Sequence, residues 1–198
     1  MERWKGVSIL FALLALGCAR TTQTLYQPIR NVKGYDSQFD VPAPAEVRNI
    51  IQQILHSLCK KDCGEIFIVR NPTVIDIRNE QIGTKKSKII YLPKFIESLT
   101  QRYGPQATFG IFAHEVGHHI GSIMSPDLVA TPWDRELHAD DLSGCAIAMA
   151  GFTTGQLESA ILNEATYPSH SHPSSPLRIK AIRQGYLHCG GNISDFRR

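Results

Sequence analysis

The pattern of apolar and polar residues predicts a series of helices. After Pro44, apolar residues recur at i, i+3, i+4, i+7, i+8 and i+11, which is the spacing of one face of an amphipathic helix. These residues are Val47, Ile50, Ile51, Ile54, Leu55 and Leu58. A second segment begins at Pro105 and is apolar on nearly every side except at its His and Glu residues. It therefore predicts a helix in the centre of the fold.

Shorter runs predict strands and further helices. Strands are expected at residues 64–69, 74–77 and 87–92. Helices are expected at residues 93–99 and 131–151, and from Thr153 and Ser175 onward. A helix followed by a few strands and then by helices favours an α+β fold.

The first residues have the character of an export signal. Arg3 and Lys5 precede an apolar run over residues 6–17, which has the length of a signal-peptide core and is short for a membrane span. The small residues before Cys18 resemble the lipidation sequence of bacterial lipoproteins, although Ala15 stands where those proteins usually carry Leu. We therefore expect Cys18 to be lipidated, with an ordinary secretory signal as the alternative.

This reading divides the chain into three parts. Residues 1–17 are expected to be a signal peptide, residues 18–43 a lipid-anchored tether or N-terminal arm, and residues 44–198 the folded domain. No segment after the signal is long and apolar enough to span a bilayer, so membrane contact is expected only through the anchor. The expected location is the bacterial cell envelope.

The five cysteines also favour export. Setting aside Cys18 leaves four, an even number that suits two disulfides in an oxidising compartment. Cys59 and Cys63 could bridge locally at a helix end, and Cys145 with Cys189 would close a long loop. A zinc site built from these thiols is disfavoured, because the chain has neither CxxC spacing nor a paired knuckle.

Composition narrows the function only slightly. The chain has 198 residues, of which 42% are hydrophobic and 20% are charged, which is typical of one globular domain and argues against disorder. Its formal net charge of +3 is too small to attract nucleic acid strongly, so no nucleic-acid partner is expected.

The chemistry lies in a His-Glu-Val-Gly-His-His sequence that begins at His114. Positions i and i+4 of a helix are offset by about 40°, so His114 and His118 project from one face and supply half of a tetrahedral zinc site. Glu115 lies beside them as the expected general base toward a water molecule. Gly117 costs about 1 kcal/mol in a helix interior, which indicates a close approach of another element. His119 is expected to be structural, or a partner of Glu115, rather than a ligand.

A third protein ligand is expected from the sequence Glu-Leu-His-Ala-Asp that begins at Glu136. Glu136 and Asp140 form another i, i+4 pair on one helix face. Glu136 could bind zinc while Asp140 accepts a hydrogen bond from a ligand imidazole. The rival ligand is His138, which points to another side of the same helix.

Three motifs in order resemble the gluzincin metallopeptidases, specifically the M48 group that includes the CAAX-processing and HtpX-like membrane proteases. They are His-Glu-Val-Gly-His, Glu-Leu-His-Ala-Asp and a later His-Pro…Arg-Ile segment, and the resemblance covers about residues 45–187. It implies a zincin-like domain in which a central helix carries the first motif. The implied roles are zinc ligand for His114, His118 and Glu136, general base for Glu115, and support of a ligand for Asp140.

The resemblance also implies a way to bind substrate. Residues 87–92 would be the edge strand that pairs with an extended protein or peptide. His172 and Arg178 of the His-Pro…Arg-Ile segment could assist the transition state or latch the site, whereas exposed positions for His170 and His172 are the alternative. Many members of the group carry transmembrane helices around the domain, and this chain does not, so prenyl-protein processing does not carry over.

The sequence thus predicts an exported zinc endopeptidase with one Zn²⁺ per chain, acting on envelope or exported proteins. Two alternatives lack catalysis. One is a quality-control or chaperone-like envelope factor with a latched or structural zinc site. The other is a metal-binding export protein whose site is closed by four protein ligands.

Overall fold

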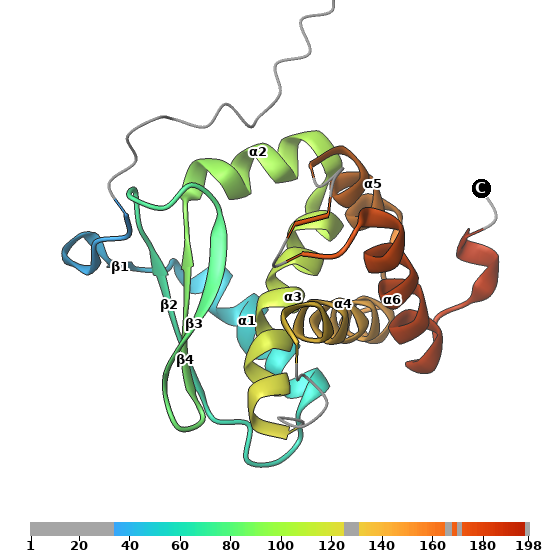
Figure 1. Ribbon diagram of the computed structural model, residues 1–198, viewed down its shortest axis with the longest axis horizontal. Coiled ribbons are helices and arrows are strands. Elements are labelled where there is room, and N and C mark those ends of the chain that lie inside the picture. Colours follow the sequence, from blue (N-terminus) through green and yellow to red (C-terminus); the bar gives the residue numbers. More distant parts are fainter. Residues whose placement is uncertain (1–33, 125–130, 165–167, 170–171, 197–198) are drawn as a thin grey trace, which may run out of the picture.

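The computed structural model describes residues 34–124, 131–164, 168–169 and 172–196, and the expected signal peptide, Cys18 and His170 lie outside them. The described residues form an α+β fold, as the sequence predicts (Figure 1). The helices are α1 (Ala45–Leu58), α2 (Pro93–Tyr103), α3 (Pro105–Met124), α4 (Pro132–Met149), α5 (Gly155–Glu164) and α6 (Ser175–His188). The strands are β1 (Val41–Pro42), β2 (Glu65–Arg70), β3 (Ile77–Gly83) and β4 (Lys86–Tyr91), and short 3-10 helices lie at Ser37–Phe39 and Ile193–Phe196.

The four strands form one sheet in the order β1-β2-β4-β3. Strands β2 and β4 are parallel, whereas β3 and β4 form an antiparallel hairpin. Because β3 folds back onto the outer side of β4, β4 lies inside the sheet. The expectation that residues 87–92 form an edge strand is therefore wrong, and β3 is the edge strand beside α3.

The strand expected at residues 74–77 is also placed differently. Residues 71–76 form turns, because the Asn71 side chain accepts hydrogen bonds from the backbone N–H and the hydroxyl of Thr73. Strand β3 begins only at Ile77. Its polar sequence hides it from a search for apolar alternation, because no residue of this edge strand is fully buried.

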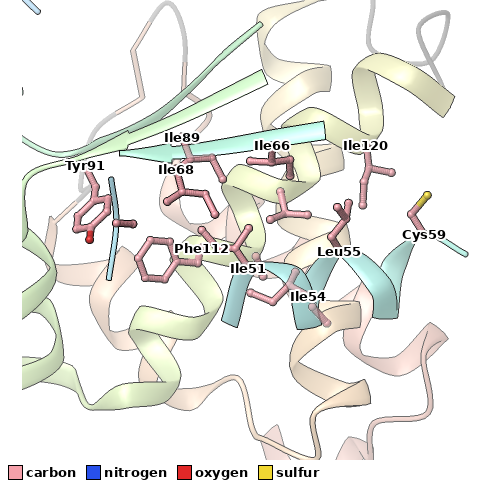
Figure 2. Packing of buried hydrophobic residues seen from close by; sticks show 14 residues of the cluster. Ile51, Ile54, Leu55, Cys59, Ile66, Ile68, Ile89, Tyr91, Phe112 and Ile120 are labelled. Atoms are coloured by element: carbon pink, nitrogen blue, oxygen red, sulfur yellow. The ribbon is translucent and has the colours of Figure 1, made fainter. Parts of the chain in front are cut away.

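The main core lies between the sheet and helices α1 and α3 (Figure 2). Ile51 and Ile54 of α1 are fully buried, and they pack with Ile89 of β4 and Phe112 of α3. On its other side α3 packs against α4, and α4 packs against α6 (Figure 1). Helix α3 is therefore covered on both sides, which explains why it is apolar nearly all round.

Helices α4 and α6 approach each other through glycines. A Cβ at Gly144 would lie 1.9 Å from the carbonyl oxygen of Ile182, and one at Gly185 would lie 1.7 Å from that of Asp141. The same two helices are also joined by a cysteine pair. Cys145 lies in the last turns of α4, and Cys189 caps the C-terminus of α6.

Both expected cysteine pairs lie at disulfide distance. The Cα atoms of Cys145 and Cys189 are 5.0 Å apart, and those of Cys59 and Cys63 are 5.7 Å apart. The first bridge spans 44 residues of sequence and the second closes a short loop after α1. Within the residues that the structure describes, no helix is both long and apolar enough to cross a membrane.

Residues before α1 pack on the sheet as an arm. Asp40 accepts hydrogen bonds from Tyr35, Asn71 and Lys88. Strand β1 follows directly and pairs with β2. The part of the expected tether that the structure describes is thus docked on the domain.

The Gly185 contact makes a test of the packing between α4 and α6. We expect Gly185→Ala to lower the free energy of unfolding by about 3 kcal/mol, because the new methyl group meets backbone that cannot move without parting the helices. Gly155→Ala is the matched control, since a Cβ there meets nothing within 4 Å. Urea unfolding would measure both variants, and equal midpoints would contradict this account of the packing.

Candidate metal centre

The centre of the molecule joins two helices at a third glycine. A Cβ on Gly117 of α3 would lie 2.9 Å from the Cα and 3.0 Å from the carbonyl oxygen of Ala139 on α4. Only glycine permits this approach without moving a backbone. The approach brings the His114 and His118 face of α3 onto the Glu136 face of α4.

Three side chains converge where these faces meet. Ligand-type atoms of His114, His118 and Glu136 all lie within 4.8 Å of one another. Nε2 of His114 is 3.4 Å from one carboxylate oxygen of Glu136, and Nε2 of His118 is 3.4 Å from the other. Two imidazoles and one carboxylate are a common donor set of catalytic zinc sites.

The hydrogen bonding of these groups fits a bound cation. Nδ1 of His114 is 2.9 Å from Oδ1 of Asp140, and a carboxylate only accepts hydrogen bonds, so the ring proton lies on Nδ1. Nε2 of a neutral His114 then turns its lone pair toward Glu136. Oε2 of Glu136 is buried and has no hydrogen-bond partner. A metal ion between the neutral His114 ring and Glu136 would satisfy both the lone pair of Nε2 and this carboxylate oxygen.

The electrostatics also call for positive charge at this point. Burial acts to lower the pKa of His114, but the Asp140 carboxylate and the hydrogen bonds to Asp140 and Glu136 raise it to about 10. Burial acts to raise the pKa of Glu136, but the facing His114 and His118 rings hold it well below its usual range. Without a metal, a proton on His114 supplies the positive charge that balances the buried carboxylates of Asp140 and Glu136. A divalent cation would supply the same charge and leave the imidazoles neutral.

Asp140 is held from a third helix. Its side chain is 1% exposed, and the guanidinium of Arg178 on α6 donates to both of its oxygens at 2.8 Å. Burial favours the neutral acid, but His114 and Arg178 keep the pKa of Asp140 low overall. The carboxylate is therefore ionised and fixes the orientation of the His114 ring.

Glu115 lies next to the converging side chains and is buried. Burial raises the pKa of its carboxyl group, while His114 and His118 act in the opposite direction. The nearby carboxylates of Glu136 and Asp76 add to the rise. A carboxyl group in such surroundings is suited to take up and release a proton nearer neutral pH than an exposed one.

The remaining residues singled out in the sequence fall in different places. Nε2 of His172 is 3.4 Å from Oε2 of Glu136, and its side chain is 52% exposed, so it reaches the centre from the solvent side. Arg178 instead lies behind the centre, bonded to Asp140. His119 faces Ser87 and the carbonyl of Cys63 and not the converging donors. His138 is outside the one group of metal-type ligands found among the described residues.

Two polar residues near the centre were not predicted from the sequence. Asp76 directly precedes edge strand β3, and Asn79 belongs to it. The Asn79 side chain donates to the carbonyl of Glu115 at 3.1 Å. The alternation of residues in β4 could have indicated Asn79, because it places the polar Ser87 on the same face as the core residues Ile89 and Tyr91. A buried hydroxyl needs a polar partner, so Ser87 predicts polar side chains on the elements that pack against it. These are His119 on α3 and Asn79 on β3.

Comparisons of the chain with protein-family models, curated proteins and solved structures find no match. The case for a function therefore depends on the side chains of this centre and on the three motifs that carry them.

Removal of the support behind Asp140 makes a direct test of this geometry. We expect Arg178→Met to lower the free energy of unfolding by about 3–5 kcal/mol, because it leaves a buried carboxylate without its cation. Lys180→Met is the control on the same helix. Its side chain is exposed, so we expect a change of no more than about 0.5 kcal/mol. Denaturant unfolding of metal-free protein would show equal losses if the Asp140 pair were unimportant.

Proposed function

We propose that this protein is a zinc-dependent endopeptidase with a zincin-like domain. The observation that carries the proposal is the convergence of His114, His118 and Glu136 beside the buried Glu115. The order and spacing of these residues resemble the gluzincin pattern, and the packing of α3 on α4 supports the same set of ligands.

The three converging side chains would hold one Zn²⁺ and leave a further position open, which is the arrangement of a catalytic rather than a structural site. When bound, the ion would polarise a peptide carbonyl and lower the pKa of a water molecule. Asp140 keeps the proton of His114 on Nδ1, so that the lone pair of Nε2 remains available to bind the metal. Arg178 keeps Asp140 ionised for that task.

Glu115 is the proposed general base. Its carboxylate would take a proton from the attacking water and pass it to the amine that leaves when the peptide bond breaks. His172 approaches from the solvent side and would donate a hydrogen bond to the substrate during this step. The substrate would be an extended segment of an envelope or exported protein, paired with edge strand β3 through its backbone.

The position of His172 also favours a second candidate function. Its Nε2 lies as close to Glu136 as those of the two proposed ligands do, at 3.4 Å. A His in this place could occupy the fourth position of the metal and latch the site. The protein would then be a non-proteolytic quality-control or chaperone-like factor of the cell envelope.

The proposed location is the bacterial cell envelope, with the chain anchored to a membrane by a lipid on Cys18. Two cysteine pairs at disulfide distance favour an oxidising compartment.

Metal content is the first test. Elemental analysis of the purified protein should find about one zinc per chain, because three protein ligands are preformed. Glu136→Ala should lose the metal or bind it much more weakly. His138→Ala is the control from the same helix and should keep it. If the wild type takes up no zinc when zinc is supplied, the proposal fails.

The role of Glu115 is tested separately. Glu115→Gln should keep its zinc and lower kcat toward an unfolded protein substrate such as casein by about 10²–10⁴-fold, because an amide cannot accept the proton of the water. Glu46→Gln, an exposed position on α1, should cleave like the wild type. A Glu115→Gln protein that cleaves at the wild-type rate would refute the role. If a Glu115→Gln protein that no longer cleaves restored the wild-type phenotype to a deletion strain, the non-proteolytic function would be favoured.

A further inference from the structure

A chain of buried hydrogen bonds connects the edge strand with the helix that carries Glu115. His119 Nε2 is 2.7 Å from the carbonyl oxygen of Cys63, and His119 Nδ1 is 2.9 Å from the hydroxyl of Ser87. The Asn79 amide nitrogen lies 3.1 Å from that hydroxyl and 3.1 Å from the carbonyl oxygen of Glu115. Ser87 and His119 are each 1% exposed, so the chain is closed to solvent along most of its length.

The chemistry of the two ends fixes the direction of every bond. A carbonyl oxygen only accepts, so His119 carries its proton on Nε2, and Nδ1 of the neutral ring accepts. Ser87 therefore donates its hydroxyl proton to His119. At the other end the atom that faces the Glu115 carbonyl must be the NH₂ group of Asn79, and its second proton goes to Ser87. Each proton in the chain has an acceptor, which is the condition for a buried polar network to hold one geometry.

The bond to Glu115 is unusual for a helix interior. In an α-helix the carbonyl of Glu115 accepts the backbone N–H of His119 four residues later. Asn79 adds a second donor to this oxygen from another element of the fold. The turn of α3 from Glu115 to His119 is thus tied to β3 by Asn79 and to β4 by Ser87.

We propose that Asn79 is a positioning residue that fixes the turn of α3 bearing Glu115 at a set offset from edge strand β3. This inference rests on the proposed function for its catalytic consequence. A peptide paired with β3 takes its register from that strand, whereas the base takes its place from α3. Asn79 joins the two, so it sets where the scissile carbonyl stands relative to the Glu115 carboxylate. A displacement of about 1 Å between such groups is enough to lower a rate by about 10²-fold.

Two of the three proposed zinc ligands are held from outside this chain of hydrogen bonds. The His114 ring is fixed by Asp140, and Glu136 belongs to α4, which packs on the opposite side of α3 from the sheet. Loss of Asn79 should therefore move the base relative to the substrate. His118 lies in the same turn and would move with it, while His114 and Glu136 keep the metal bound. Folding should also survive, because the apolar core between α3 and the sheet does not include Asn79.

The test compares Asn79→Ala with Gln81→Ala. Gln81 lies two residues further along β3, on the same face of the strand, but it is exposed. In the zinc-loaded enzyme, Asn79→Ala should lower kcat by about 10–100-fold while KM changes little, because the peptide still pairs with β3. Gln81→Ala should match the wild type in both. Bound zinc and the thermal unfolding midpoint serve to show that the metal and the fold are retained.

A second measurement avoids catalysis. In metal-free protein, Asn79→Ala should speed hydrogen exchange of the His119 backbone amide, which bonds to the Glu115 carbonyl, and Gln81→Ala should not. The ¹⁵N resonances of His119 should show the Nε2–H tautomer, and Ser87→Ala should shift the Nδ1 resonance as its donor is lost.

The outcomes separate the two proposals. Equal kcat for Asn79→Ala and Gln81→Ala, or a loss that only follows the unfolded fraction, overturns the positioning role even in an active enzyme. If the zinc-loaded wild type cleaves nothing, the proposed function fails, and the exchange measurement alone then decides whether Asn79 ties α3 to β3. Unchanged exchange in Asn79→Ala overturns that tie.

Discussion

The close approach of α3 and α4 is the constraint on which the rest of the structure depends. With Gly117 against Ala139, two backbones lie in contact and leave no room for side chains between them. The polar faces of the two helices therefore lie directly against each other. They bring two imidazoles and a carboxylate together inside the molecule. Burial of such groups costs free energy unless each has a partner. Much of the surrounding architecture supplies those partners.

The partners come from helix α6 on one side and from the sheet on the other. Helix α6 supplies Arg178 for Asp140, and its own approach to α4 is made possible by Gly144 and Gly185. The sheet supplies Asn79 and Ser87 for the polar side of α3. Only the space among the three converging donors is left to a group from outside the chain. Among the described residues, the buried side-chain atoms without a hydrogen-bond partner are Nε of Arg78 and Oε2 of Glu136, and the second of these lies at the proposed metal position.

Periodicity in the sequence predicted the helices well because each has a strong apolar face or a clear start. The Thr131 cap of α4 and the apolar stripe of α1 are examples. The i, i+4 spacings also placed His114, His118 and Glu136 on facing surfaces. What the sequence did not show is pairing between distant residues. Strand β3 is polar because it lies at an edge, so its place in the sheet and the bond from Asn79 to α3 depend on tertiary contacts. The Arg178–Asp140 pair likewise joins residues 38 apart in the chain.

The position of Arg178 has a consequence for the order in which the molecule can be completed. A chain that emerges from the ribosome or from a translocation pore delivers α3 and α4 long before α6. Until α6 docks, Asp140 has no guanidinium to hold its charge, and the His114 ring has no fixed orientation. The Cys145–Cys189 bridge then joins the last helix to α4. A chain that lacks α6 would therefore carry all three proposed metal ligands without the guanidinium that fixes their support, and it would become competent to hold a metal only when α6 docks.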